Sequence, residues 1–171
     1  AEGAPHRKIW LMARNHSCEA AASFVLEGIL EAALSPDVVG KQLRENWEFI
    51  ATPFMDKDGV EEGDQGKLRH PHDHNRDYNE DPIYPEVAAA MRWGKEHQSS
   101  IAAFLDIHCP MVHGPWDNRF YLVGSPFPKV EAHQDAFMDV FGKYRAGQVD
   151  RHESGVLHFG EAWNTDANFT G

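Results

Sequence analysis

The sequence is short of cysteine, of long apolar runs and of positive charge, and each shortage excludes a class of protein. The two cysteines, Cys18 and Cys109, form no disulfide framework, and we expect reduced, partly buried thiols. No apolar run approaches the ~20 residues of a bilayer-spanning helix, and residues 1–8 lack the apolar core of a signal peptide. With 16 Lys and Arg against 27 Asp and Glu, the formal net charge is −11. We therefore expect neither nucleic acid nor a membrane as partner.

The rest of the composition is that of a soluble globular protein. The residues are 42% hydrophobic and 25% charged, which excludes disordered and fibrous classes, and 11 histidines are the one unusual count. A length of 171 residues predicts a single domain over residues 1–171 with a substantial core. The chain enters a strand almost at once, which suggests a processed chain or a piece of a longer one. The compartment stays open, with a cytoplasmic location favoured over secretion.

Apolar runs alternate with helical patterns along the chain. Short apolar runs predict strands at 8–13, 47–53 and 101–107. Apolar positions recurring at intervals of three and four predict helices at 19–34, 85–98 and 129–144. This alternation predicts an α/β fold, a three-layer α/β/α arrangement with a mixed, largely parallel sheet. Residues 56–59 are expected to form a turn and residues 61–74 a long loop of the kind that is usually functional.

The segment His16-Ser17-Cys18-Glu19 lies where the first strand gives way to the first helix. An imidazole and a carboxylate three residues apart can hold one divalent metal ion, although this spacing also arises often by chance. His108 follows the third strand, and the carboxyl ends of parallel strands meet at one edge of a sheet. His16, Glu19 and His108 would then form the ligand set of hydrolytic zinc sites, which leave a fourth position for water.

The loop contains a second group of chemically useful residues, Asp73-His74-Asn75-Arg76. Arg76 is suited to a bidentate grip on a carboxylate, and Asn75 can donate a hydrogen bond beside it. Asp73 is suited to accept from the second ring nitrogen of a metal-bound histidine. The alternative is a solvated turn with surface ion pairs. Three histidines are expected to be solvated rather than ligands of a second metal: His70, His72 and His74.

Four segments stand in order between residues 8 and 110: His16 to Glu19 before a helix containing Phe24 to Gly28, Pro53 to Val60, Asp73 to Tyr78, and Leu105 to His108. Together they resemble the zinc carboxypeptidases of the funnelin type, the carboxypeptidase A-like or M14 peptidases. The second segment is similar to the family's Pro-x-x-Asn-Pro-Asp-Gly piece, and the third to its Asp-x-Asn-Arg-x-aromatic signature. The fourth is similar to the strand that bears the last zinc ligand. The resemblance is to the cytosolic or bacterial branch rather than the digestive one.

The resemblance implies a zinc metallocarboxypeptidase that hydrolyses the C-terminal peptide bond with metal-activated water. It implies one zinc ion per chain, held by His16, Glu19 and His108. It also implies that Asn75 and Arg76 bind the free C-terminal carboxylate of a peptide substrate, with Asp73 supporting His16.

Two catalytic roles match the family pattern less closely. For the oxyanion-stabilising residue, Lys67 and Arg69 compete, and we prefer Arg69 because its planar fork suits an oxyanion. For the general base, Glu153 and Glu161 are available, and Glu161 follows an apolar alternation. We expect instead that the strand carrying the base lies beyond Gly171, so that the domain lacks its late strands and its activity alone is open.

Three further interpretations stay open. A chain without the base would be a non-catalytic zinc-binding or peptide-binding module. Zinc amino-acid deacylases share His-x-x-Glu and Asp-x-Asn-Arg, although the helix around Phe24 to Gly28 and the Asp58-Gly59 segment favour the peptidase branch. After His108, four residues either line a pocket for a substrate side chain or pack in exposed loops: Trp116, Arg119, Phe120 and Tyr121.

Overall fold

The computed structural model describes residues 7–109, 119–148 and 150–168, which form two compact units. The first unit lies within residues 1–110 and the second within residues 111–169. No helix in these described ranges is both long enough and apolar enough to cross a membrane. The single domain expected over residues 1–171 stays a prediction.

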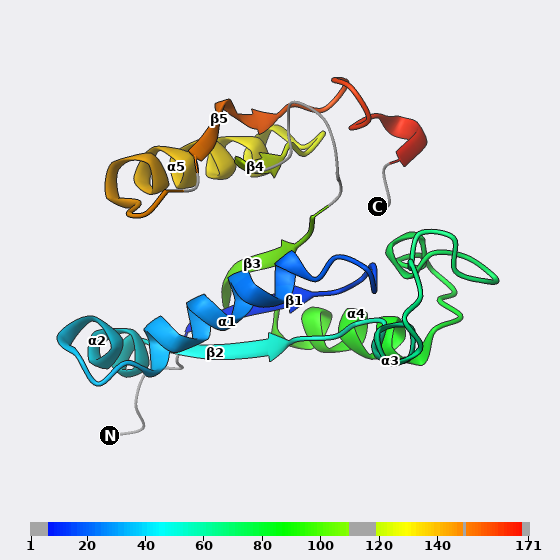
Figure 1. Cartoon of the computed structure of the whole chain (residues 1–171), viewed down its shortest axis with the longest axis horizontal. Helices are drawn as coiled ribbons and strands as arrows, with labels where there is room; N and C mark the ends of the chain where they lie inside the picture. Colours follow the sequence, from blue (N-terminus) through cyan, green and yellow to red (C-terminus); the bar gives the residue numbers. More distant parts are fainter. Residues whose placement is uncertain (1–6, 110–118, 149, 169–171) are drawn as a thin grey trace. The chain divides into compact units, whose positions relative to one another are not determined.

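The first unit is built on a three-stranded parallel sheet in the order β2-β1-β3 (Figure 1). Its strands are β1 (Arg7–Ala13), β2 (Trp47–Thr52) and β3 (Ile101–Ile107). The segments between them contain α1 (Ala21–Leu34), α2 (Val38–Asn46), α3 (Lys57–Glu62), η1 (His74–Arg76) and α4 (Pro85–His97). All three strands therefore end at the same edge of the sheet, as the α/β prediction requires.

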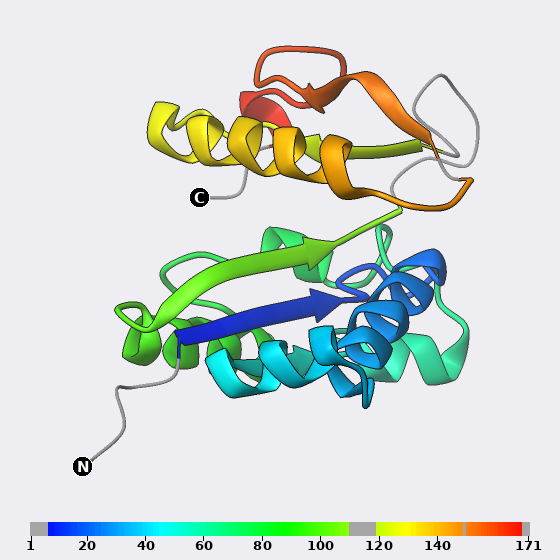
Figure 2. The ribbon, with the colours of Figure 1, turned by 90° about the vertical axis from the view of Figure 1, so that its left-hand side faces the viewer.

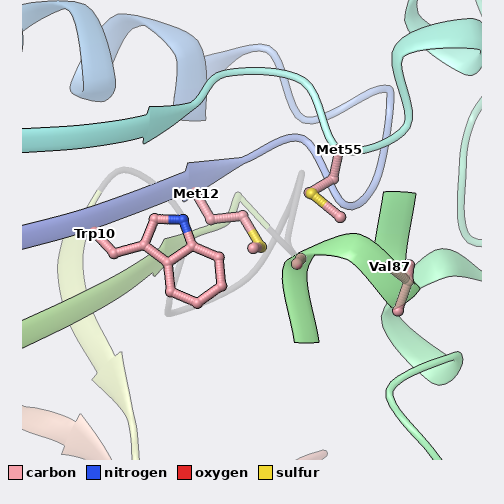
Figure 3. Close-up of a cluster of buried hydrophobic side chains, with 5 residues drawn as sticks. Trp10, Met12, Met55 and Val87 are labelled. Atoms are coloured by element: carbon pink, nitrogen blue, oxygen red, sulfur yellow. The ribbon is translucent and has the colours of Figure 1, made fainter. Parts of the chain in front are cut away.

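Alternate side chains of β1 enter two separate cores, one on each face of the sheet. Trp10 and Met12 pack with Met55 and with Val87 of α4 (Figure 3). The neighbouring strand residues Leu11 and Ala13 pack instead with α1. Because successive strand residues point to opposite faces, α1 and α4 cover the sheet from opposite sides (Figure 2). The expected layering of helix, parallel sheet and helix is confirmed.

Leu11 tests the face covered by α1. Its side chain is 1% exposed in the central strand, so Leu11→Ala removes buried methyl groups and leaves a cavity beneath α1. We expect the free energy of unfolding to fall by about 2–5 kcal/mol in urea titrations. Leu34→Ala is the control, because Leu34 is 72% exposed and its loss should change the free energy of unfolding by less than about 0.5 kcal/mol.

Two helices of this unit were not expected. The turn predicted at residues 56–59 is wrong: Asp56 caps α3 by accepting from the Gly59 amide at 2.9 Å. Asp37 caps α2 in the same way, accepting from the Gly40 amide at 2.8 Å. In both places an aspartate that is typical of a turn begins a helix, because its carboxylate satisfies an amide of the first helical turn. The polar loop is correspondingly shorter and follows Gly63, the left-handed end of α3.

The second unit contains a parallel strand pair, β4 (Arg119–Val123) and β5 (Asp150–Leu157), joined through α5 (Pro128–Tyr144) and followed by η2 (Asp166–Asn168). The helix predicted at 129–144 is confirmed. Arg119 to Tyr121 lie in strand β4 rather than in an exposed loop. Phe120 stacks on Phe141 of α5 with 4.2 Å between ring centroids. Trp116 lies outside the described residues. Gly155 has φ of 71°, and a Cβ there would lie 3.1 Å from Met138, so this bend of β5 requires glycine.

Candidate metal centre

A sharp bend at Arg14 places His16 at the carboxyl edge of the sheet. Arg14 has φ of 62°, a left-handed conformation that is uncommon for residues other than glycine. The bend is held from both sides, since the Arg14 guanidinium donates to the Ser17 carbonyl through Nε at 2.9 Å, and the Arg14 carbonyl accepts from the Asp56 amide at 3.0 Å. The end of β1, the start of α1 and the segment after β2 are thereby tied together.

His16, Glu19 and His108 form one compact group. Each offers one ligand atom, and these atoms lie within 4.8 Å of one another. His16 Nδ1 lies 3.0 Å from Glu19 Oε1, and His108 Nδ1 lies 2.9 Å from Glu19 Oε2. Both imidazoles therefore direct the same ring nitrogen toward one carboxylate. The side chain of Glu19 is only 2% exposed, so this carboxylate is shielded from water.

The opposite nitrogen of each imidazole is bound by an aspartate. His16 Nε2 lies 3.0 Å from Asp73 Oδ2, and His108 Nε2 lies 2.9 Å from Asp106 Oδ2. A carboxylate accepts only, so each Nε2 carries a proton and donates it, and in the metal-free protein Nδ1 donates to Glu19 as well; a metal ion would take the place of the Nδ1 proton. Asp73 was expected in this position, whereas Asp106 was not assigned a role. The signal for Asp106 was its spacing, because residues two apart lie on the same face of a strand.

Asp106 is itself held by a buried chain of hydrogen bonds. Asn15 donates from Nδ2 to Asp106 Oδ1 at 3.0 Å, and Tyr78 donates its hydroxyl to Asn15 Oδ1 at 2.9 Å. Asn15 is fully buried, so its amide orientation is fixed by these partners. Asn15 belongs to no motif and Tyr78 is the aromatic residue of the Asp73 to Tyr78 segment, and only the packing of three elements brings them to His108.

The carboxylates control the charges of the group. Burial opposes the charged form of each imidazole, but the hydrogen bonds that His16 donates to Asp73 and Glu19 raise its pKa above the usual 6.5. Burial is likewise outweighed at His108, where the charge and hydrogen bond of Asp106, together with Glu19, raise the pKa to about 10. The pKa values of Glu19 and Asp73 are lowered despite burial, because each carboxylate accepts from an imidazole.

These shifts fix how the metal-free protein responds to pH. The raised pKa values of His16 and His108 contribute stability that is complete below pH 6.5 and is lost as pH rises through their folded values, about 10 for His108. We expect urea unfolding of the metal-free protein to show this loss between pH 6.5 and pH 10. Asp106→Asn removes a cause of the shift at His108, so its unfolding free energy should fall less steeply over the same range. Equal slopes for the two proteins would contradict this assignment.

The donor set fits zinc. Two neutral imidazole nitrogens and one carboxylate, with a further position open, are a common zinc ligand set in hydrolytic sites. Aspartate partners on the far ring nitrogens are also usual for zinc-bound histidines, since they fix the tautomer and raise the basicity of the ligand.

Asn75 and Arg76 lie on η1, directly after Asp73. The Asn75 backbone amide donates to Asp73 Oδ1 at 2.7 Å, while Asp73 Oδ2 accepts from His16. The Arg76 side chain is exposed and donates to the Asn75 carbonyl at 3.1 Å. Asp73 thus connects the segment that carries Asn75 and Arg76 to His16.

The two cations weighed for the oxyanion role are in different surroundings. Lys67 Nζ lies 2.9 Å from Glu19 Oε1, in direct contact with the ligand group. The Arg69 guanidinium binds the Asp64 carboxylate and lies 3.4 Å from Asp56 Oδ1. The structure therefore brings Lys67 to the ligand carboxylate and gives Arg69 other acidic partners.

One of the loop histidines, His74, is not solvated as expected, whereas His72 keeps 37% of its side chain exposed. His74 is 1% exposed, stacks on Tyr84 with 3.8 Å between ring centroids, and binds Glu86 through Nε2 at 2.6 Å. His72 binds Asp77 at 2.7 Å. The expectation for His74 was wrong because this residue packs against the start of α4, which supplies Glu86. Neither histidine belongs to the group of potential ligands.

The residues considered for the general base lie in the second unit. Glu161 is exposed in a turn, where its Oε2 accepts from the His158 amide at 3.3 Å. The side chain of Glu153 lies outside the described part of the chain. Both cysteines are free, as expected, although Cys18 is exposed rather than partly buried.

The chain is similar to carboxypeptidases among both curated proteins and solved structures. Cytosolic carboxypeptidase 4 of Mus musculus is 45% identical over 53 residues, and its Homo sapiens counterpart is 43% identical over the same length. A metallo-carboxypeptidase from Pseudomonas aeruginosa has a TM-score of 0.68 at 25% identity over 90% of the chain. A second, from Burkholderia cenocepacia, has a TM-score of 0.65 at 22% identity over 83%. The chain is metallocarboxypeptidase-like.

The matches cover only part of each related protein. The 53 matched residues are 31% of this chain and 5% of either cytosolic carboxypeptidase. The chain spans 44% of the Pseudomonas aeruginosa structure and 39% of the Burkholderia cenocepacia structure. No protein-family model matches it. Fold and general kind are therefore shared.

Proposed function

We propose that the chain holds zinc through His16, Glu19 and His108 and is part of a metallocarboxypeptidase that removes C-terminal residues from peptides. One observation carries this proposal: both histidines direct Nδ1 to Glu19 while an aspartate holds each Nε2. Zinc bound there would supply Lewis-acid chemistry, lowering the pKa of water and polarising a peptide carbonyl. The names of the curated relatives support a cytoplasmic location as part of the proposal.

Other residues of the chain are proposed to bind the substrate, orient the histidines and act in catalysis. Asn75 and Arg76 would bind the terminal carboxylate of the peptide, since the guanidinium is exposed and Asp73, which binds His16, also accepts from the Asn75 backbone amide. Asp73 and Asp106 would keep the two histidines in the ligand tautomer. Arg69 remains the proposed oxyanion group, with Lys67 as its alternative. The base is proposed as Glu161 or as a residue outside this chain.

The carboxylate preference has support from a relative. The Pseudomonas aeruginosa metallo-carboxypeptidase was solved in complex with (2-guanidinoethylmercapto)succinic acid, a compound with two carboxylates. The same compound is therefore a suitable probe of the site in this chain, because its binding does not depend on turnover.

The test combines metal, ligand and substrate. We expect about one zinc ion per chain and zinc-dependent binding of the succinic acid probe. In a chain that includes its general base, we expect hydrolysis of peptides with a free C-terminus but not of amidated peptides. Zinc and probe binding without hydrolysis would favour the non-catalytic module instead. Hydrolysis confined to N-acyl amino acids would favour the deacylase. A chain that neither retains nor rebinds zinc would overturn the metal centre.

A further inference from the structure

Among the described residues, the Glu19 carboxylate has four partners, and one of them is the ammonium of Lys67. Oε1 lies 3.0 Å from His16 Nδ1 and 2.9 Å from Lys67 Nζ. Oε2 lies 2.9 Å from His108 Nδ1 and accepts from the Cys109 amide at 2.8 Å. The two histidines are ligands in the proposed centre, and the amide belongs to the backbone after β3. Lys67 is therefore the partner that can leave.

The backbone places Lys67 at this point. Gly66 has φ of 92°, and a Cβ there would lie 2.6 Å from the Ser17 amide nitrogen and 2.9 Å from His16 Cα. This approach is open only to glycine. Ser17 Oγ donates to the Asp64 carbonyl at 2.8 Å, which holds the same loop from its other side. The loop is thus packed on the backbone of His16 and Ser17, and the next residue after Gly66 extends to Glu19.

We propose that Lys67 is a built-in competitor for the metal ion. In the metal-free protein its ammonium compensates the charge of a carboxylate that is 2% exposed. A divalent ion bound to Glu19 would adjoin this ammonium, and the two positive charges repel strongly in a site shielded from water. Metal binding therefore requires Lys67 to withdraw from Oε1, which its flexible, 32% exposed side chain allows. Lys67 lowers the affinity of the centre and stabilises its metal-free form.

This inference rests on the proposed zinc centre and is tested by binding rather than by turnover. Zinc affinity is measured by chelator competition on the metal-free full chain and on three variants. Lys67→Met removes the charge, Lys67→Gln removes it while keeping a polar head, and Lys67→Arg keeps it. Lys57→Met is the matched control, because Lys57 pairs with Glu61 on the exposed side of α3.

We expect Lys67→Met and Lys67→Gln to bind zinc about tenfold more tightly or better, and Lys67→Arg and Lys57→Met to stay within about threefold of the unmodified chain. The melting temperature of the metal-free protein should fall in the two uncharged Lys67 variants. Unchanged or weaker zinc binding in both uncharged variants would overturn the competitor role alone. An unmodified chain that binds no zinc would overturn the metal centre and this inference together.

Discussion

His108→Ala is expected to abolish zinc binding by this chain. The variant removes one of three ligand atoms that lie within 4.8 Å of one another and leaves Glu19 with His16 alone. Zinc affinity depends on the number of ligands, so we expect the dissociation constant to rise by about three orders of magnitude and the zinc content after dialysis to fall from about one ion per chain to near zero. Elemental analysis and chelator competition measure both quantities.

His158→Ala is the matched control for this loss. His158 Nδ1 also binds a glutamate, Glu131, at 2.8 Å, but no third ligand joins this exposed pair among the described residues. Its removal should leave zinc content and affinity unchanged. If His108→Ala retains zinc with the affinity of the unmodified chain, His108 is not a ligand. Equal losses in the two variants would mean that zinc binds nonspecifically to surface histidines.

Arg76→Ala is expected to weaken binding of ligands that carry a free carboxylate by about a hundredfold. A guanidinium binds a carboxylate through two parallel charge-assisted hydrogen bonds, and removing one partner of such a pair costs about 2–5 kcal/mol once the bound ligand buries it. Arg76 is exposed, and the one hydrogen bond described for its guanidinium goes to the Asn75 carbonyl, so its head is accessible to a ligand. Calorimetry with (2-guanidinoethylmercapto)succinic acid on the zinc-loaded chain measures the change.

Amidated ligands separate charge recognition from a general loss of structure. A peptide with an amidated C-terminus should bind the unmodified chain and Arg76→Ala with similar affinity, because it lacks the carboxylate that Arg76 binds. Arg92→Ala, at an exposed position of α4, is the control for loss of one surface arginine and should leave probe binding unchanged. An equal effect of Arg76→Ala on free and amidated ligands would contradict the carboxylate role. Zinc content should stay near one ion per chain in both variants.

Several elements follow from local patterns that tertiary contacts do not override. Strands β1 and β3 are short apolar runs, and α4 and α5 have apolar residues on one face, so their types and approximate bounds were predictable. Helices α2 and α3 were not predicted, because Asp37 and Asp56 are as suitable for turns as for helix caps. Strands β4 and β5 pack on α5, and this packing has no local signature in the sequence.

The sequence by itself determined which residues could bind a metal and where they would meet. His16 and His108 each follow a buried parallel strand, and neighbouring strands of a parallel sheet end at one edge, so the encounter follows from topology. Tertiary structure alone decided how these residues are oriented and charged. Asp106, Asn15 and Tyr78 come from three separate segments, and Gly66 allows Lys67 to reach Glu19 only through close backbone packing. Such contacts require segments far apart in the chain to be placed to within a few tenths of an ångström of one another's ideal positions. Residue types and spacing do not encode this placement.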